Sequence, residues 1–196
     1  MVLLLAGCAS SGVTSLAGAT LTSTSRQVHS AQDLVAAAPA TVFVFWSAGC
    51  PCVRRYQERI EALAAAWRPR GIAFVQVSSN AGETLESLTL EHARRGLALP
   101  VWRDEGGQLA QALQARSTPT VVFVGRDGTV LFRGWVDNER TPGEPDREAW
   151  LEAALTGFTR GEAFASHTPT WGCTITRSLG LATTPSCHQP SPGETP

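Results

Sequence analysis

Lysine is absent from this 196-residue chain, in which all 16 basic residues are arginines. We interpret this bias as a property of the coding genome, because no single site would require it. Charge of one sign is also scarce, since the formal net charge is only −1. A chain this close to neutral is not expected to have nucleic acid as a main partner. No internal repeat is visible, so the length fits one core-bearing domain with extensions.

Long apolar runs are missing as well, and the apolar run of residues 1–8 is far too short to span a bilayer. Its end, Leu5-Ala6-Gly7-Cys8, resembles the processing box of bacterial lipoproteins, in which the cysteine is lipidated. We therefore expect residues 1–8 to be a lipoprotein signal and Cys8 to carry lipid. The Ser/Thr/Gly/Ala-rich residues 9–29 are expected to form a flexible tether. This predicts a lipid-anchored protein of the bacterial cell envelope, facing the periplasm or the outside.

Only five cysteines are present. If Cys8 carries lipid, the other four are Cys50, Cys52, Cys173 and Cys187. An even number outside the cytoplasm fits disulfide chemistry. Four cysteines allow three full pairings, and spacing alone does not choose among them.

Apolar periodicity predicts an α/β fold. Strands are expected at 41–46, 72–77, 101–102, 120–124 and 129–135, and helices at 31–38, from 51 to Pro69, at 83–95, 108–115 and 146–159. Strands that alternate with helices require a mostly parallel sheet with helices on both faces, and the last two strands add an antiparallel hairpin. We expect this domain to span residues 30–161. Residues 162–196 have no period and are expected to form an irregular tail that contains two cysteines.

Cys50-Pro51-Cys52 follows the buried strand 41–46 and begins an amphipathic helix. Pro51 suits the first helical turn, because its missing N–H would have no partner there. The free N–H groups and the positive end of the helix dipole favour a thiolate at Cys50. Because the thiolate is the reactive form of cysteine, this placement favours redox chemistry over a buried structural cysteine.

Three segments resemble the thioredoxin superfamily: the lead-in at residues 45–50, the Ser117-Thr118-Pro119-Thr120 segment before a strand, and the hairpin at 126–135. The resemblance covers roughly residues 30–160. It implies a thioredoxin-like fold in which Pro119 follows a cis peptide bond and faces Cys50. The backbone beside such a proline pairs with a bound peptide in that fold. Trp46 either shelters the thiol or is a core aromatic.

A narrower resemblance is to the redoxin, or AhpC/TSA-type peroxiredoxin-like, branch. It is carried by residues 50–56, by Ser78-Ser79-Asn80 and by residues 168–175, which contain Cys173. The sequence departs from thioredoxin at Val53, where a second active-site cysteine is usual, and at Val44, where thioredoxin has a buried carboxylate. No arginine occupies the position that peroxiredoxins place against their cysteine.

The site predicted from these residues has Cys50 as nucleophile and Trp46, Pro51, Thr118 and Pro119 as support. Either Cys52 or Cys173 resolves a bond to Cys50, and the sequence leaves both open. The predicted activity is disulfide exchange with thiol- or disulfide-bearing proteins.

Two alternatives remain open: a thiol peroxidase that reduces peroxides, and a copper carrier that uses the soft thiolates of Cys-Pro-Cys. The absence of a histidine near Pro119 counts against copper. We expect a monomer without a cofactor.

Overall fold

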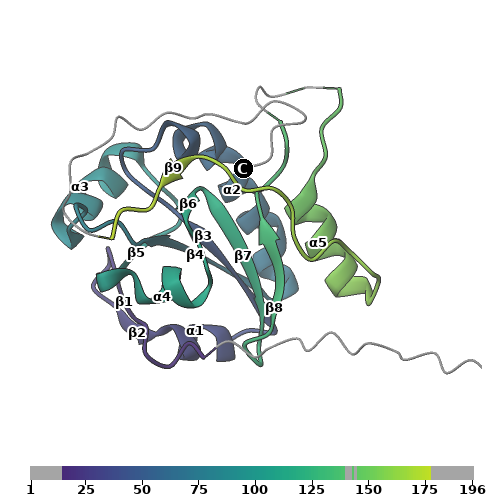
Figure 1. Cartoon of the computed structure of the whole chain (residues 1–196), viewed down its shortest axis with the longest axis horizontal. Coiled ribbons are helices and arrows are strands. Elements are labelled where there is room, and N and C mark those ends of the chain that lie inside the picture. Colours follow the sequence, from purple (N-terminus) through teal and green to yellow (C-terminus); the bar gives the residue numbers. More distant parts are fainter. Residues whose placement is uncertain (1–14, 140–142, 144, 178–196) are drawn as a thin grey trace, which may run out of the picture.

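The structure is a computed structural model that describes residues 15–139, 143 and 145–177. Its centre is a seven-stranded sheet with the order β2-β1-β5-β4-β3-β7-β8 (Figure 1). The strands are β1 (Thr20–Ser23), β2 (Val28–Ser30), β3 (Ala40–Phe45), β4 (Ile72–Ser78), β5 (Val101–Asp104), β7 (Thr120–Gly125) and β8 (Val130–Gly134). The short strands β6 (Ser117–Thr118) and β9 (Cys173–Thr174) form a separate pair.

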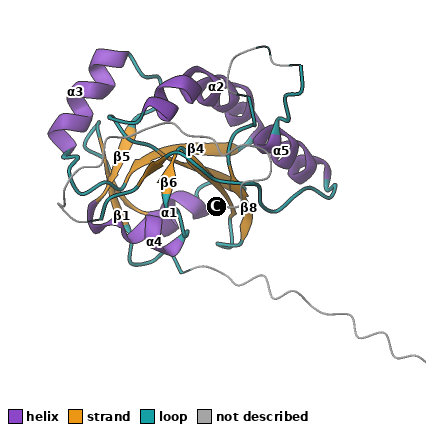
Figure 2. Cartoon of the chain, turned by 45° about the horizontal axis from the view of Figure 1, so that its top comes forward, coloured by secondary structure: helices purple, strands orange, loops and turns teal. Residues whose placement is uncertain are grey.

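The helices lie on both faces of the sheet (Figure 2). One face carries α2 (Pro51–Trp67), α3 (Leu85–Arg95) and α5 (Trp150–Arg160), and the other carries α1 (Ala31–Ala36) and α4 (Gln108–Ala112). Single 3-10 turns follow α2 at Arg68–Arg70 and precede α4 at Glu105–Gly107. This is the thioredoxin-like α/β fold that the sequence predicts.

The sheet is parallel at its centre and antiparallel at both edges. Strands β3, β4 and β5 are mutually parallel, whereas β7 runs antiparallel to β3 and continues into the hairpin with β8. All six residues of β3 and all six of β7 are buried, as expected for strands covered on both faces. These two strands form the core against which the site is built.

Helix α2 begins and buries its face as the sequence predicts. Cys50 is its N-cap residue and Pro51 its first helical residue. On its apolar face Val53, Tyr56, Ile60 and Trp67 are buried, and Leu63 is partly buried and packs on the core. The helix is followed by Gly71, whose φ of 85° allows the sharp turn into β4.

The prediction of a flexible tether at residues 9–29 is wrong for residues 15–29, the part of this range that the structure describes. Strand β1 pairs with β2 and with the edge of β5. Leu16 and Leu21 are completely buried under the sheet. The physical reason is that β5 would otherwise expose an unpaired edge, and β1 covers it. The ordered domain therefore begins well before residue 30.

The tail expected to be irregular from residue 162 is largely so as far as residue 177, with β9 as its only strand among the described residues. It is nevertheless packed against the domain, since Trp171, Cys173 and Ile175 are buried. Cys8 and Cys187 lie outside the described residues. Within the described part, no helix has the length and apolar character needed to cross a bilayer.

Candidate active site

Cys50 lies where β3 gives way to α2. The chain leaves the buried sheet at Phe45, turns through residues 46–49 and enters the helix at Cys50, which has extended backbone angles (φ −81°, ψ 118°). Its sulfur is thus fixed between two elements of the core. The N–H groups of the first turn of α2 point toward this end of the helix and favour negative charge on the sulfur.

The Thr118–Pro119 peptide bond is cis, as the sequence predicts. The loop before Cys50 and the loop that contains Pro119 lie side by side because of the strand register. Phe45, the last residue of β3, pairs with Thr120, the first residue of β7. Residues 117–119 therefore lie beside the loop that leads to Cys50. The Thr118 carbonyl oxygen is 3.2 Å from the Cys50 sulfur.

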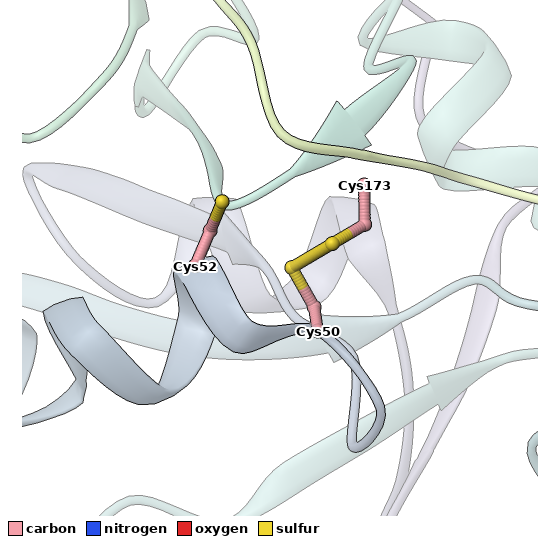
Figure 3. A group of neighbouring side chains, drawn as sticks. All are labelled: Cys50, Cys52 and Cys173. Carbon is pink, nitrogen blue, oxygen red and sulfur yellow. A yellow bond between two sulfur atoms is a disulfide. The ribbon is translucent and has the colours of Figure 1, made fainter. Parts of the chain in front are cut away.

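Cys50 forms a disulfide with Cys173, which is 123 residues away in the sequence (Figure 3). The two Cα atoms are 5.9 Å apart, within the normal range for a disulfide. Of the two partners that the sequence left open, the structure brings Cys173 into the bond. Cys173 reaches this position because β9 pairs antiparallel with β6, where Thr118 lies opposite Cys173.

The Cys52 sulfur lies beside this bond, on the first turn of α2 (Figure 3). The sulfur atoms of Cys50, Cys52 and Cys173 all lie within 4.8 Å of one another, and all three residues are buried. Thiolates at such spacing suit a soft ion such as Cu(I) when the cysteines are reduced. The same spacing also suits exchange of a disulfide among the three sulfurs.

The sequence favoured a reactive cysteine over a buried structural one at position 50, and in this disulfide-bonded state the reactive position is itself buried. Cys50 is completely buried. The physical reason is the C-terminal segment, which carries Cys173 past β6 and over the start of α2 (Figure 1). The helix end that should face solvent is covered by a strand that the sequence did not predict.

Trp46 is a fully buried core residue. Its indole N–H donates to the Gln57 side chain (2.9 Å), and the Gln57 amide donates to Gln76 (3.0 Å). This chain of amides ties the loop before Cys50 to α2 and β4. Pro51 and Arg54, by contrast, are exposed beside the site.

Glu83 is a site residue that sequence reasoning missed. Its carboxylate accepts hydrogen bonds from the Ser47 hydroxyl (2.9 Å) and the Ala48 N–H (2.7 Å), and its other oxygen accepts one from Ser78. It therefore fixes the turn that precedes Cys50. The one signal in the sequence is its place three residues after the Ser78-Ser79-Asn80 segment.

A second polar cluster holds α2 one to two helical turns beyond Cys52. Arg59 pairs with the fully buried Asp137 (2.7 Å) and with Glu139 (2.9 Å). The Tyr56 hydroxyl donates to the Glu139 carbonyl oxygen. Burial, and next the negative charge of Asp137, raise the pKa of Tyr56 to about 12.

Residues 16–133 match the family model described as the AhpC/TSA family. The chain belongs to the AhpC/TSA family. The match covers more than half of the sequence and includes the helix start at Cys50 and the cis-proline loop, as the resemblance seen in the sequence implied. Cys173 and its segment lie beyond the matched residues.

Two solved bacterial structures are similar to this chain over most of its length. A hypothetical protein from Sinorhizobium meliloti is 25% identical, with a TM-score of 0.73 over 86% of this chain and 96% of that chain. An uncharacterised conserved protein from Geobacillus kaustophilus is 27% identical, with a TM-score of 0.74 over 87% and 94%. Both matches cover more of the chain than the family model does.

A curated relative is the thiol-disulfide oxidoreductase ResA of Halalkalibacterium halodurans. The two proteins are 25% identical over 87 residues, which are 44% of this chain. The match spans about half of that relative's length, 48%.

Proposed function

We propose that this AhpC/TSA-family protein is a thiol–disulfide oxidoreductase that exchanges disulfides with partner proteins through Cys50. The observation that carries the proposal is the Cys50–Cys173 disulfide at the N-terminus of α2, beside the cis Thr118–Pro119 bond. A cysteine at a helix start with a second cysteine in bonding distance can cycle between dithiol and disulfide. Similarity to ResA supports the same chemistry.

In the reduced protein, the Cys50 thiolate attacks one sulfur of a partner disulfide. The partner's S–S bond breaks, its other sulfur leaves as a thiolate, and Cys50 is joined to the partner. The Cys173 thiolate then attacks the Cys50 sulfur, closes the Cys50–Cys173 bond and expels the partner's remaining thiolate. Two electrons pass to the partner, and its two thiolates take protons from solvent. The reverse sequence transfers the disulfide to a reduced partner.

Exchange is tested by the reduction of insulin with dithiothreitol, comparing the wild-type chain with Cys50→Ser. The wild type should accelerate the reaction and Cys50→Ser should leave it at the uncatalysed rate. Cys8→Ser is the matched control, because it replaces sulfur by oxygen at a cysteine that is not one of the proposed exchange cysteines. Equal rates for wild type and Cys50→Ser would remove the proposal.

Anchoring at the envelope is the second part of the proposal, and it is supported by the processing-box resemblance at residues 5–8. Cells that express the full chain and are fed a labelled fatty acid should incorporate the label into the wild type. Cys8→Ser should lose the label and leave the membrane fraction. Labelling of Cys8→Ser at the wild-type level would contradict the anchor.

Copper binding is a second candidate, favoured by the three buried sulfurs within 4.8 Å of one another. In the reduced protein, Cys50, Cys52 and Cys173 would supply three soft ligands to one Cu(I) ion. Competition against a Cu(I)-specific dye measures this directly. One tight equivalent that is lost in Cys52→Ser would support a carrier, and no binding tighter than that of glutathione would dispose of it.

Peroxide reduction is the third candidate, and family membership supports it. Peroxide would convert the Cys50 thiolate to a sulfenic acid and release water or an alcohol. Cys173 would then form the disulfide and release a second water. Peroxide consumption no faster than that of free cysteine would exclude this activity.

A further inference from the structure

Residues 171–175, here called the cover segment, bind to the domain as an added strand. Thr118 lies opposite Cys173 and Ser117 opposite Thr174 in the β6–β9 pair. Beyond the pair, the Ile175 N–H donates to the Arg116 carbonyl oxygen (2.8 Å). The segment thus occupies the backbone edge beside Cys50. Backbone pairing of this kind accepts any extended chain, and side-chain pockets provide the selectivity.

Alternate side chains of the cover segment point into the domain. Trp171, Cys173 and Ile175 are each 8% exposed or less, whereas Thr174 is exposed. The Trp171 ring lies 3.9 Å from the Trp135 ring, centre to centre, and Ile175 joins the core on the α1 and α4 side of the sheet. An aromatic residue two positions before the cysteine and an apolar one two positions after it therefore each fill a specific place.

Position 172 has no space for the side chain of any residue other than glycine. Its φ is +108°, a conformation that side chains other than hydrogen rarely adopt. A Cβ atom at this position would overlap the Thr118 carbonyl oxygen and lie 3.3 Å from the Trp135 ring. A chain that binds along β6 in this register therefore needs glycine directly before its cysteine.

The end of the cover segment is also held by specific contacts. The Thr176 N–H donates to the Asn80 side chain (3.0 Å), and the Thr176 carbonyl oxygen accepts from the Ala81 N–H (2.8 Å). The Ser78-Ser79-Asn80 segment and the residues around Cys173, which the sequence shows only as separate motifs, meet at this point. The contact extends the binding edge from the cis-proline loop to the end of β4.

We propose that the cover segment is an internal substrate, whose place is taken by an extended partner segment of the pattern aromatic–Gly–Cys–polar–apolar. The proposal rests on the exchange activity proposed above and names its substrate class. In the disulfide-bonded protein the cover segment blocks the β6 edge and buries Cys50. The cover segment must leave that edge before a partner segment can pair with β6.

The release step is a thiol–disulfide exchange that needs a dithiol reductant. One thiolate of the reductant attacks the Cys173 sulfur, the Cys50–Cys173 bond breaks, and Cys50 leaves as a thiolate. The reductant's second thiolate then attacks the reductant sulfur that is bonded to Cys173, which releases Cys173 as a thiolate. The reductant ends as a disulfide and has given two electrons. The freed cover segment can then exchange with a partner segment on β6.

The test compares two variants of the full chain in the reduced state. One is the single variant Cys173→Ser, and the other is the double variant that also carries Gly172→Ala. The second substitution puts a Cβ against the Thr118 carbonyl oxygen and so keeps the cover segment off β6. The probe is a peptide with the sequence of residues 168–177 whose cysteine carries a nitrothiobenzoate leaving group. The part of the nitrothiobenzoate release that is lost when Cys50→Ser is added reports attack by Cys50. Matched control peptides carry alanine in place of the glycine, or in place of the tryptophan.

The double variant should react with the probe at least about tenfold faster than Cys173→Ser alone, because its β6 edge is open. It should also prefer the probe over each control peptide by about tenfold. Equal rates with all peptides, or no gain from opening the edge, would overturn the proposal. If Gly172→Ala prevents folding, Trp171→Ala in the Cys173→Ser chain opens the edge instead.

A small disulfide, hydroxyethyl disulfide, separates this proposal from the proposed function. If Cys50 attacks hydroxyethyl disulfide but does not distinguish the peptides, only the internal-substrate proposal fails. If Cys50 attacks no disulfide in any variant, the exchange activity fails and takes the internal-substrate proposal with it.

Discussion

The two sulfurs of the Cys50–Cys173 bond are held by very different structures. Cys50 lies between β3 and α2, and both elements are anchored in the core of the domain. Cys173 lies on an irregular segment that pairs with the domain through the two-residue strand β9. The Cys50 side of the bond is therefore the fixed half, and the Cys173 side is the detachable half. A redox cycle in which one sulfur receives partners and the other withdraws needs that division.

Damage to the packing around Cys50 should lower the free energy of unfolding of the protein more than any other change to either half of the bond. Ile60→Ala removes a fully buried side chain on α2 and should lower the free energy of unfolding by about 2–5 kcal/mol. Chemical denaturation monitored by circular dichroism measures the change. Leu90→Ala, at a side chain that is 73% exposed, is the control and should stay within about 0.5 kcal/mol of wild type. Similar losses for both would contradict the assigned core.

The segment that carries Cys173 should contribute to the stability of the protein mainly through its covalent bond to Cys50. Cys173→Ser should lower the free energy of unfolding of the oxidised protein by about 2–4 kcal/mol, because it opens a loop of 123 residues. The same denaturation experiment with excess dithiothreitol should show nearly equal stability for variant and wild type. A variant that remains as stable as the oxidised wild type would show that Cys50 and Cys173 do not bond in solution.

Gly172→Ala tests the cover segment without removing a sulfur. The added Cβ should cost about 1–3 kcal/mol of stability in the oxidised protein, since the covalent bond forces the segment against Thr118. In the reduced protein the cost should be smaller, because it is limited to the free energy that holds the segment on β6, about 1.4 kcal/mol for an edge that is blocked about tenfold. Gly82→Ala is the matched control, since a Cβ there meets nothing within 4 Å. An equal cost in both redox states would mean that the segment stays bound after reduction.

The core of the domain was predictable from the sequence because its signals are local. The continuous apolar runs of β3, β4 and β7 and the amphipathic helix α2, which begins at Pro51, appear where the patterns predict them. The cis bond before Pro119 followed from the resemblance of a short motif. The β1–β2 hairpin was missed because its Ser- and Thr-rich sequence looks like a linker, and only pairing with β5 gives it a structure.

The sequence narrowed the partner of Cys50 to Cys52 or Cys173 but did not choose between them, since the choice depends on the register of two short strands far apart in the chain. The register that places Cys173 opposite Thr118 comes from the fit of Trp171, Gly172 and Ile175, which no pattern in the tail reveals. Glu83 was missed for a similar reason: an acidic residue in a polar loop looks solvated until the loop of Ser47 is folded against it.

The smallest expected effect lies on the fixed half, at the only tyrosine of the chain. Tyr56→Phe should cost about 0.5–1.5 kcal/mol at neutral pH, because the hydrogen bond to Glu139 is lost. The pKa of Tyr56 in the folded protein is about 12, above its ordinary value of 10. Its contribution is therefore fully present below pH 10 and is lost as the pH rises toward 12. Denaturation of wild type and Tyr56→Phe across this range should show the difference shrinking, and a constant difference would contradict the raised pKa.

Trp171 gives the molecule a built-in optical signal. Its ring lies against the Trp135 ring and 6.0 Å from the Trp150 ring. Trp171 is only two residues from Cys173, whose sulfur is released on reduction. Departure of the cover segment breaks this group of indoles and transfers one of them to water. Intrinsic fluorescence therefore follows the redox state of the protein without any added dye.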